Sequence, residues 1–262
     1  MVRVRRTVSS RRETVQALRD LSELHSPKGR ARPGPSFLLG QSGLDWRSMK
    51  SERVLVFERY AERYDAWFDS HRFAYESELA ALRKVWPVAS RTMEVGAGTG
   101  RFMLPLNISV GVEPAKRAAA IARRRGALVI CAFAESLPFR SSVFDAVLMV
   151  TTICFLDDPS GAVAEARRVL VPEGRLVLAF VDAGSSVGRD YLTARSDSVF
   201  YRVARFYSAD DVVRLLATSG FSPERFVQTI FRDPEKLSRA DDVREGHGEG
   251  AFVVVKARKV RS

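Results

Sequence analysis

One turn restricts the folds open to this chain more than any other feature of its sequence. Residues 96–100 have the sequence Gly-Ala-Gly-Thr-Gly and directly follow Thr92–Val95, an apolar run of strand length. Glycine lets the backbone turn tightly, and it lets N–H groups approach a ligand without a side chain in the way. A plain turn is the alternative for such a cluster taken alone. Joined to a strand, the turn predicts a ligand site at the carboxyl edge of a parallel sheet.

The sequence beyond the turn predicts the rest of that sheet. From residue 91 onward, strand-length apolar runs alternate with helix-length segments, as in a mainly parallel α/β fold. Two helices have clear starts, because Asp158 can cap the helix that follows it, and Ser208 with Asp211 matches a capping box. The predicted strands are residues 92–95, 109–112, 127–131, 144–151, 175–181, 226–231 and 251–255.

The first 48 residues differ from the remainder in composition. They mix Arg, Ser, Gly and Pro without a sustained apolar period, which predicts a disordered basic tail. Residues 1–50 carry a net charge of +7 out of the total of +11, which leaves +4 for the rest of the chain. Met49 stands where foldable sequence begins, so it is an alternative start of translation, with residues 1–48 as a misassigned extension.

A helical cap is predicted between this tail and the sheet. Phe57, Tyr60, Tyr64 and Phe68 recur at three- and four-residue intervals, the period of an amphipathic helix, and a second helix is expected from about residue 75 to residue 85. The sequence therefore predicts a tail at residues 1–48, a cap at 49–88 and an α/β domain at 89–258.

Several classes of protein are excluded by composition. The longest apolar runs are of strand length, far below the roughly 20 residues of a membrane-spanning helix, so no membrane partner is expected. The arginines near the N-terminus lack the apolar stretch of a secretory signal. Cys131 and Cys154 are the chain's two cysteines, too few for a disulfide framework or a zinc site. A soluble, cytoplasmic protein without a metal is predicted.

The spacing after the turn indicates a nucleoside ligand. Glu113 stands seventeen residues after Gly96, at the end of the next predicted strand. A carboxylate there can accept hydrogen bonds from both hydroxyls of a ribose. A dinucleotide site would need glycine or another small residue at position 101, where this chain has Arg101.

With Glu94 directly before it, the glycine turn resembles that of class I S-adenosylmethionine-dependent methyltransferases. Residues 134–139, 144–149 and 170–176 resemble that family's adenine-side loop, its fourth strand and the turn into its fifth. The resemblance covers about residues 55–257. It implies a doubly wound, Rossmann-like sheet of seven strands in the order 3-2-1-4-5-7-6, with the last strand antiparallel. The interval from Gly100 to residue 109 is short for the family and leaves barely two turns for the first crossover helix.

The resemblance also implies the cofactor, S-adenosyl-L-methionine, with S-adenosyl-L-homocysteine as the product. The turn would wrap the methionine part, Glu113 would hold the ribose, and Thr151 would lie near the sulfonium. Many relatives have Asp where this chain has Phe133, which could stack on adenine instead. The predicted cofactor-binding residues are Glu94, Gly96, Ala97, Gly98, Gly100, Glu113, Pro114, Phe133, Ala134, Glu135 and Thr151.

The methyl acceptor is less readable. Methyl transfer depends mainly on positioning, and a general base is needed only where the attacking atom must lose a proton. His71, Tyr64 and Tyr75 in the predicted cap are the candidates for catalysis. The alternative for His71 is a capping or packing role between two helices, and the tyrosines could equally fasten the cap to the sheet.

The leading hypothesis for function is methyl transfer to nitrogen, oxygen or sulfur of a small molecule. The runs at residues 64–79 and 149–155 resemble a group of small prokaryotic methyltransferases without an established substrate. One alternative is an RNA or protein methyltransferase whose basic tail supplies affinity for nucleic acid. Another is a regulatory domain that binds the cofactor without catalysis. The sequence does not indicate an oligomeric state.

Overall fold

The computed structural model describes residues 51–193 and 198–261, without the side chains of residues 190–192. Every described residue belongs to one compact unit of the chain. The predicted tail at residues 1–48 therefore lies outside the described residues.

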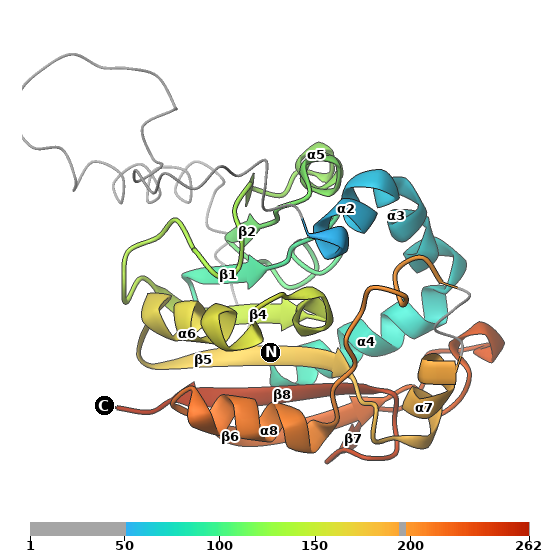
Figure 1. The fold of residues 1–262 in the computed structure, drawn as a ribbon. Helices are drawn as coiled ribbons and strands as arrows, with labels where there is room; N and C mark the ends of the chain where they lie inside the picture. Colours follow the sequence, from blue (N-terminus) through green and yellow to red (C-terminus); the bar gives the residue numbers. More distant parts are fainter. Residues whose placement is uncertain (1–50, 194–197, 262) are drawn as a thin grey trace, which may run out of the picture. The chain divides into compact units, whose positions relative to one another are not determined.

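An eight-stranded sheet forms the centre of this unit, in the order β3-β2-β1-β4-β5-β8-β6-β7 (Figure 1). Neighbouring strands from β3 to β5 run parallel, and β8 is antiparallel to both β5 and β6. The predicted order and the antiparallel last strand are confirmed. The strands are β1 Thr92–Val95, β2 Val110–Val112, β3 Val129–Ile130, β4 Phe144–Val150, β5 Leu170–Val181, β6 Phe221–Thr229, β7 Arg244–Glu245 and β8 Phe252–Lys259.

The short strand β7 was not expected, and it makes eight strands where seven were predicted. Glycines at positions 246, 248 and 250 lie between this strand and β8. Backbone pairing of Glu245 with Val227 of β6 adds the extra strand, and an ion pair from Arg225 to Glu245 joins the same two strands. These glycines therefore come after β7 in the chain and are not part of it.

Helices cover both faces of the sheet. Apolar residues of α6 and α8 pack on one face, and those of α4 and α5 pack on the other (Figure 1). The predicted helix starts are confirmed, because Asp158 accepts a hydrogen bond from the Gly161 N–H and Ser208 forms a full capping box with Asp211. The helices are α2 Glu52–Arg59, α3 Ala61–Ser70, α4 Arg72–Val85, α5 Lys116–Arg125, α6 Pro159–Val169, α7 Ser186–Thr193 and α8 Ala209–Thr218, with 3-10 turns η2 Thr152–Phe155 and η4 Pro234–Lys236.

The segment predicted as a cap forms α2, α3 and α4. One amphipathic helix was expected across residues 57–68, but the chain leaves helical geometry at Tyr60, with φ −119° and ψ 28°, so two helices form. Helix α4 buries Leu79 and Leu82 in the same cluster as Val254 of β8, so it is a layer of the sheet's own core. Helices α2 and α3 contact α5 instead.

The connection from β1 to β2 contains turns and no helix, although a crossover helix of barely two turns was predicted there. Phe102, Met103 and Leu106 are buried in it, and the Ile108 N–H donates to the Met103 carbonyl at 2.8 Å. The sheet is therefore covered here by a compact loop that begins at the glycine turn.

Over residues 51–193 and 198–261, no helix combines the length and the apolar character needed to cross a membrane.

Candidate active site

The glycine turn has the backbone geometry that its sequence predicted. Gly96, Gly98 and Gly100 all have positive φ angles, of 72°, 52° and 79°. A Cβ at position 96 would lie 2.4 Å from Oγ1 of Thr152, and one at position 98 would meet the Tyr64 ring at 3.3 Å. Only glycine fits at both places without strain or displacement of a neighbour.

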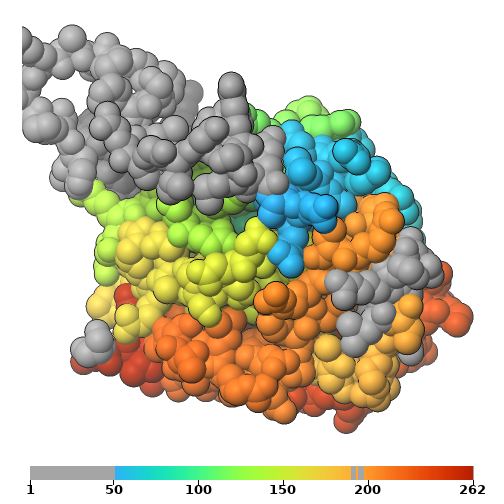
Figure 2. Space-filling view, in the orientation of Figure 1, coloured from blue at the N-terminus to red at the C-terminus, as the bar shows by residue number. Residues whose placement is uncertain are grey.

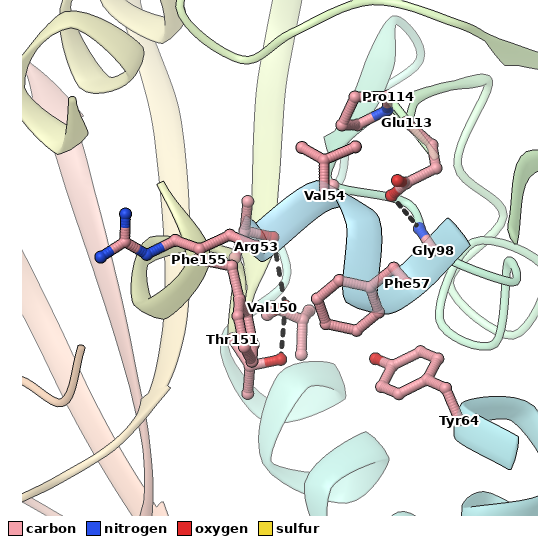
Figure 3. A pocket seen from close by; sticks show the side chains of 12 residues that line it. Arg53, Val54, Phe57, Tyr64, Gly98, Glu113, Pro114, Val150, Thr151 and Phe155 are labelled. Atoms are coloured by element: carbon pink, nitrogen blue, oxygen red, sulfur yellow. Dashed lines mark hydrogen bonds between the residues drawn. The ribbon is translucent and has the colours of Figure 1, made fainter. Parts of the chain in front are cut away.

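Glu113 closes this turn from the end of β2. The side chain is 6% exposed, and its two oxygens accept hydrogen bonds from the N–H groups of Gly98 at 2.9 Å and Ala115 at 2.8 Å (Figure 3). Burial raises the pKa of Glu113 to about 7, and the two N–H donors partly oppose this rise. A carboxylate has about four lone-pair sites, so these oxygens can accept further hydrogen bonds from a ligand.

A cavity of about 70 Å³ lies between the turn, the end of β4 and helix α2 (Figure 3). Six of the predicted site residues line it together: Gly96, Gly98, Glu113, Pro114, Thr151 and Tyr64. The other lining residues are Arg53, Val54, Phe57, Val150, Thr152 and Phe155. Sites for small organic ligands usually enclose roughly 300–1,000 Å³, so this cavity is small for such a ligand.

Two further predicted residues flank this cavity from below the turn. Glu94 is 1% exposed, and its Oε2 atom is buried without a hydrogen-bond partner among the described residues. Burial, and then the charge of Glu113, raises the pKa of Glu94 well above its usual range. Ala97 is also buried and donates its N–H to the Val112 carbonyl. An orphaned carboxyl oxygen next to the turn suits a ligand that brings its own donor.

The predicted adenine-side residues stand apart from the cavity. Phe133, Ala134 and Glu135 follow β3, where Ala134 is part of the core and the other two are half-buried. None of the three is among the lining residues. Their part in binding adenine stays a prediction.

Of the three catalytic candidates, the structure brings only Tyr64 to the cavity. Tyr75 donates its hydroxyl to the Arg101 carbonyl at 2.7 Å and packs on Phe68 and Phe102. Its hydroxyl thus ties α4 to the residue after the turn.

His71 lies at the junction of α3 and α4, in a different hollow formed with Pro234 and Leu237. Its ring stacks on Trp67 with centroids 4.6 Å apart, and Nδ1 lies 3.0 Å from the Trp67 carbonyl oxygen. The ring is thus held by its own helix, as in the packing alternative, and His71 is not among the residues that line the cavity at the turn; its part in catalysis stays a prediction.

Sequence reasoning missed Arg53 and Val54, and it gave Glu78 only as the last residue of a run of candidates in the cap, without a role of its own. Arg53 and Val54 reach the cavity from α2, and Glu78 is buried on α4. Glu78 could have been found by spacing, because it lies three residues after Tyr75 and four before Leu82, on the apolar face of a predicted helix. Nothing in the sequence indicated that α2 folds over the turn.

An ion-pair network fixes the turn to α3. Arg101 donates to the carboxylates of Asp65 at 2.9 Å and Asp69 at 2.7 Å, and Arg125 donates to Asp65 at 2.9 Å. The Arg101 side chain is 14% exposed, and its guanidinium lies 5.5 Å from the ring centroid of Phe68. The residue that argued against a dinucleotide site therefore anchors a helix beside the turn.

Comparison with known proteins assigns the family. Residues 93–178 match the model of a methyltransferase domain. A SAM-dependent methyltransferase of Thermotoga maritima, named a possible histamine N-methyltransferase, is 47% identical, with a TM-score of 0.77 over 79% of this chain and 99% of that one. The chain belongs to the S-adenosylmethionine-dependent methyltransferases. The methyltransferase described here is also similar to two curated proteins.

An uncharacterised protein of Methanocaldococcus jannaschii is 41% identical to this methyltransferase over 78% of its chain and 99% of the relative. The malonyl-[acyl-carrier protein] O-methyltransferase of Geobacter sulfurreducens is 32% identical over 63% of this chain and 68% of the relative. The enzyme uses S-adenosylmethionine, as its family does. Among the residues with described structure, no three His, Cys, Asp or Glu side chains are grouped so that they could hold a metal ion.

The residues at the turn fit this cofactor chemically. The orphaned Glu94 oxygen offers an acceptor for an ammonium group, and the glycines place no side chain between a ligand and the backbone of the turn. The buried Glu113 carboxylate offers acceptors for ribose hydroxyls. These assignments of individual residues remain proposals.

We expect Glu113 to make the affinity for S-adenosylmethionine depend on pH. With a pKa of about 7 the carboxyl group is mostly ionised at pH 8 and mostly protonated at pH 6, and only the ionised form keeps all its acceptor sites. We expect the dissociation constant measured by calorimetry to rise about tenfold from pH 8 to pH 6. Glu113→Gln should bind more weakly at pH 8 and lose most of this dependence. Equal affinities of the wild type at both pH values would contradict the role.

Proposed function

We propose that this methyltransferase transfers the methyl group of S-adenosylmethionine to nitrogen, oxygen or sulfur of a small-molecule acceptor. The observation that carries the proposal is the aromatic enclosure of the cavity by α2 and its neighbours. The ring of Phe57 lies 5.2 Å from Tyr64, 4.8 Å from Phe155 and 5.3 Å from Phe200, measured between centroids. Such walls suit a compact ligand that is surrounded on several sides.

The enclosure draws on segments far apart in sequence. Arg53 of α2 donates to the Val203 carbonyl at 3.0 Å and pairs with Asp157. Figure 2 shows α2, in blue, meeting the orange segment that precedes α8 on the surface of this face. A site that helices and a loop cover in this way excludes water from the reaction, and it admits a small acceptor more easily than a folded macromolecule.

Methyl transfer requires little of the protein besides the positioning of the cofactor and the acceptor. The cofactor supplies a methyl group already activated on a sulfonium. In the proposal, Glu113 and the glycine turn orient its nucleoside and amino-acid parts, Thr151 and Tyr64 border the reacting carbon, and Phe57 keeps water out. Positioning of this kind supplies a large part of the rate enhancement in displacement reactions.

The name of the Thermotoga protein, a possible histamine N-methyltransferase, supports a small-molecule acceptor with nitrogen as the acceptor atom. The name of the Geobacter protein specifies an oxygen of a malonyl group that is carried by a protein. We therefore leave the acceptor atom open in this proposal.

Incubation with methyl-labelled S-adenosylmethionine tests the proposal. A cell extract is divided into a low-molecular-weight fraction and a fraction of RNA and protein, and each is offered to the full chain. We expect label in the first fraction and none above background in the second, with the labelled product identified by mass spectrometry. Label confined to RNA or protein would overturn the proposal in favour of a macromolecular substrate.

A further inference from the structure

The ring of Phe57 is surrounded by aromatic rings from three other parts of the chain. Tyr64 of α3 and Phe155 of η2 both meet it edge to face, with interplanar angles of 90° and centroids 5.2 and 4.8 Å away. Phe200 lies at 5.3 Å and is tilted by 34° against the ring. Aromatic rings prefer edge-to-face and offset arrangements at such distances. Tyr64, Phe155 and Phe200 therefore form an aromatic cluster that suits one further planar ring.

The aromatic cluster borders the cavity at the glycine turn. Tyr64, Phe155 and Phe57 all line that cavity, as Gly98 of the turn does (Figure 3). A ring held in the cluster therefore lies next to the space in which the turn would hold the cofactor. Since methyl transfer needs the acceptor atom close to the methyl donor, the cluster is a suitable place for the acceptor.

Phe57 is held less firmly than the rings around it. Phe155 packs against the core on one face of the sheet, and Tyr64 packs against the core on the other face. Phe57 packs instead against a small separate cluster formed by the alanines at positions 61, 115 and 118. The two main cores thus fix the cluster, and they do not fix the ring that it surrounds.

Helix α2, which carries Phe57, has few buried contacts of its own. All eight of its residues are described, and Val56 is the one that is buried. Its ion pair from Arg53 goes to Asp157, whose side chain is 55% exposed, so that pair adds little stability. A short helix with so little buried surface opens more easily than the elements behind it. The ring of Phe57 can therefore leave while the aromatic cluster stays in place.

We propose that the methyl acceptor carries an aromatic ring, which takes the place of Phe57 between Tyr64, Phe155 and Phe200. The substrates are then small aromatic compounds whose nitrogen, oxygen or sulfur atom projects from the ring toward the glycine turn. Phe57 keeps water out of the cluster while the acceptor is absent, and the acceptor's ring does so once it is bound. This placement rests on the proposed function, to which it adds a substrate class and no further chemical step.

Binding of matched ring compounds tests this placement. The probes are benzyl and cyclohexylmethyl compounds, each as an amine, an alcohol and a thiol, titrated by calorimetry into the full chain with S-adenosylhomocysteine present. The saturated ring is at least as large and as apolar, so burial alone would not favour the benzyl compound. For at least one of the three groups we expect the benzyl compound to bind at least about fivefold more tightly, because contacts between aromatic rings add attraction that a saturated ring lacks.

Two substitutions test the residues themselves. Phe155→Leu keeps an apolar side chain in the cluster but removes one ring, and it should lower the benzyl preference to about twofold or less. Phe200→Leu serves in the same way should Phe155→Leu not fold. Phe57→Ala removes the side chain that competes for the space, so the same benzyl compound should bind at least about threefold more tightly than it does to the wild type.

Phe226→Leu is the matched control. Phe226 is also half-buried, packs against the same core as Phe155 and meets the ring of His247 at 5.0 Å between centroids, but it is not among the lining residues of the cavity. Its substitution should keep the wild-type preference. Binding of S-adenosylhomocysteine by each variant shows that the variant is folded.

The outcomes separate the aromatic acceptor from the proposed function. If the wild type binds S-adenosylhomocysteine but prefers no benzyl compound, or if a folded Phe155→Leu or Phe200→Leu variant keeps the preference, the aromatic acceptor is overturned. Unchanged or weaker benzyl binding by Phe57→Ala would overturn it as well, because Phe57 would not occupy the acceptor's place. If the wild type does not bind S-adenosylhomocysteine, the proposed function itself fails.

Discussion

Gly98→Arg is expected to abolish detectable binding of S-adenosylmethionine. Position 98 has a φ of 52°, and its N–H donates to Glu113 inside the cavity. A Cβ there already meets the Tyr64 ring at 3.3 Å, so a longer side chain must fill the space between the turn and α3. Isothermal titration should show a dissociation constant raised at least about 100-fold, a loss of about 2.7 kcal/mol.

A matched variant separates the loss of the site from the strain of the backbone. Gly248 also has a positive φ, of 96°, but a Cβ there meets nothing within 4 Å. Gly248→Arg carries a comparable conformational penalty outside the site and should bind the cofactor like the wild type. Wild-type affinity in Gly98→Arg would remove the glycine turn from the cofactor site.

Asp65→Asn is expected to lower the free energy of unfolding by about 2 kcal/mol, because it breaks a partly buried network while leaving two arginines in place. Asp65 accepts hydrogen bonds from both Arg101 and Arg125, and its side chain is 19% exposed. For a domain of this size the melting temperature should fall by roughly 4–8 °C, which calorimetry can measure.

Asp69→Asn is the control for that experiment. Asp69 pairs with the same Arg101 but its side chain is 71% exposed, so the loss should stay below about 1 kcal/mol. Equal losses in the two variants would show that burial of the network contributes nothing.

The sign of the pH effect follows from the carboxyl group of Asp65. Burial would raise its pKa, but hydrogen bonds from Arg125 and Arg101 outweigh burial and hold the pKa well below its usual value. The stabilisation is therefore complete above the unfolded value of about 3.9 and is lost as the pH falls below it. The difference in stability between Asp65→Asn and the wild type should shrink in acid.

Local signals in the sequence were enough to predict the main strands of the sheet and the part of the site that the glycine turn and Glu113 form. The glycine turn, Glu113 and the caps at Asp158 and Ser208 depend on neighbours in sequence or on the ends of adjacent parallel strands. Backbone geometry fixes where such neighbouring residues lie, so their positions could be predicted from the sequence. The antiparallel last strand came from the family resemblance rather than from periodicity.

The part of the site that helices α2 and α3 form depends on how these helices pack. The predictions were less complete for that part. The stripe of Phe57 and Phe68 has the same period whether the helix is whole or broken, so the break at Tyr60 was invisible. His71 was chosen for its chemistry, and it lines a different hollow together with Pro234, so its part in catalysis stays a prediction. A stripe of apolar residues predicts that one face of a helix is buried, but it does not predict which element packs on that face.

The break at Tyr60 separates helices α2 and α3, which are attached differently to the rest of the site. Helix α3 is tied to the turn through Arg101, whereas α2 lies over the small cavity and meets the turn through Val54 and Phe57. We therefore expect the cofactor to enter by displacing α2, while α3 stays in place. The association rate should level off at high cofactor concentration, at a ceiling set by how often this helix opens rather than by diffusion.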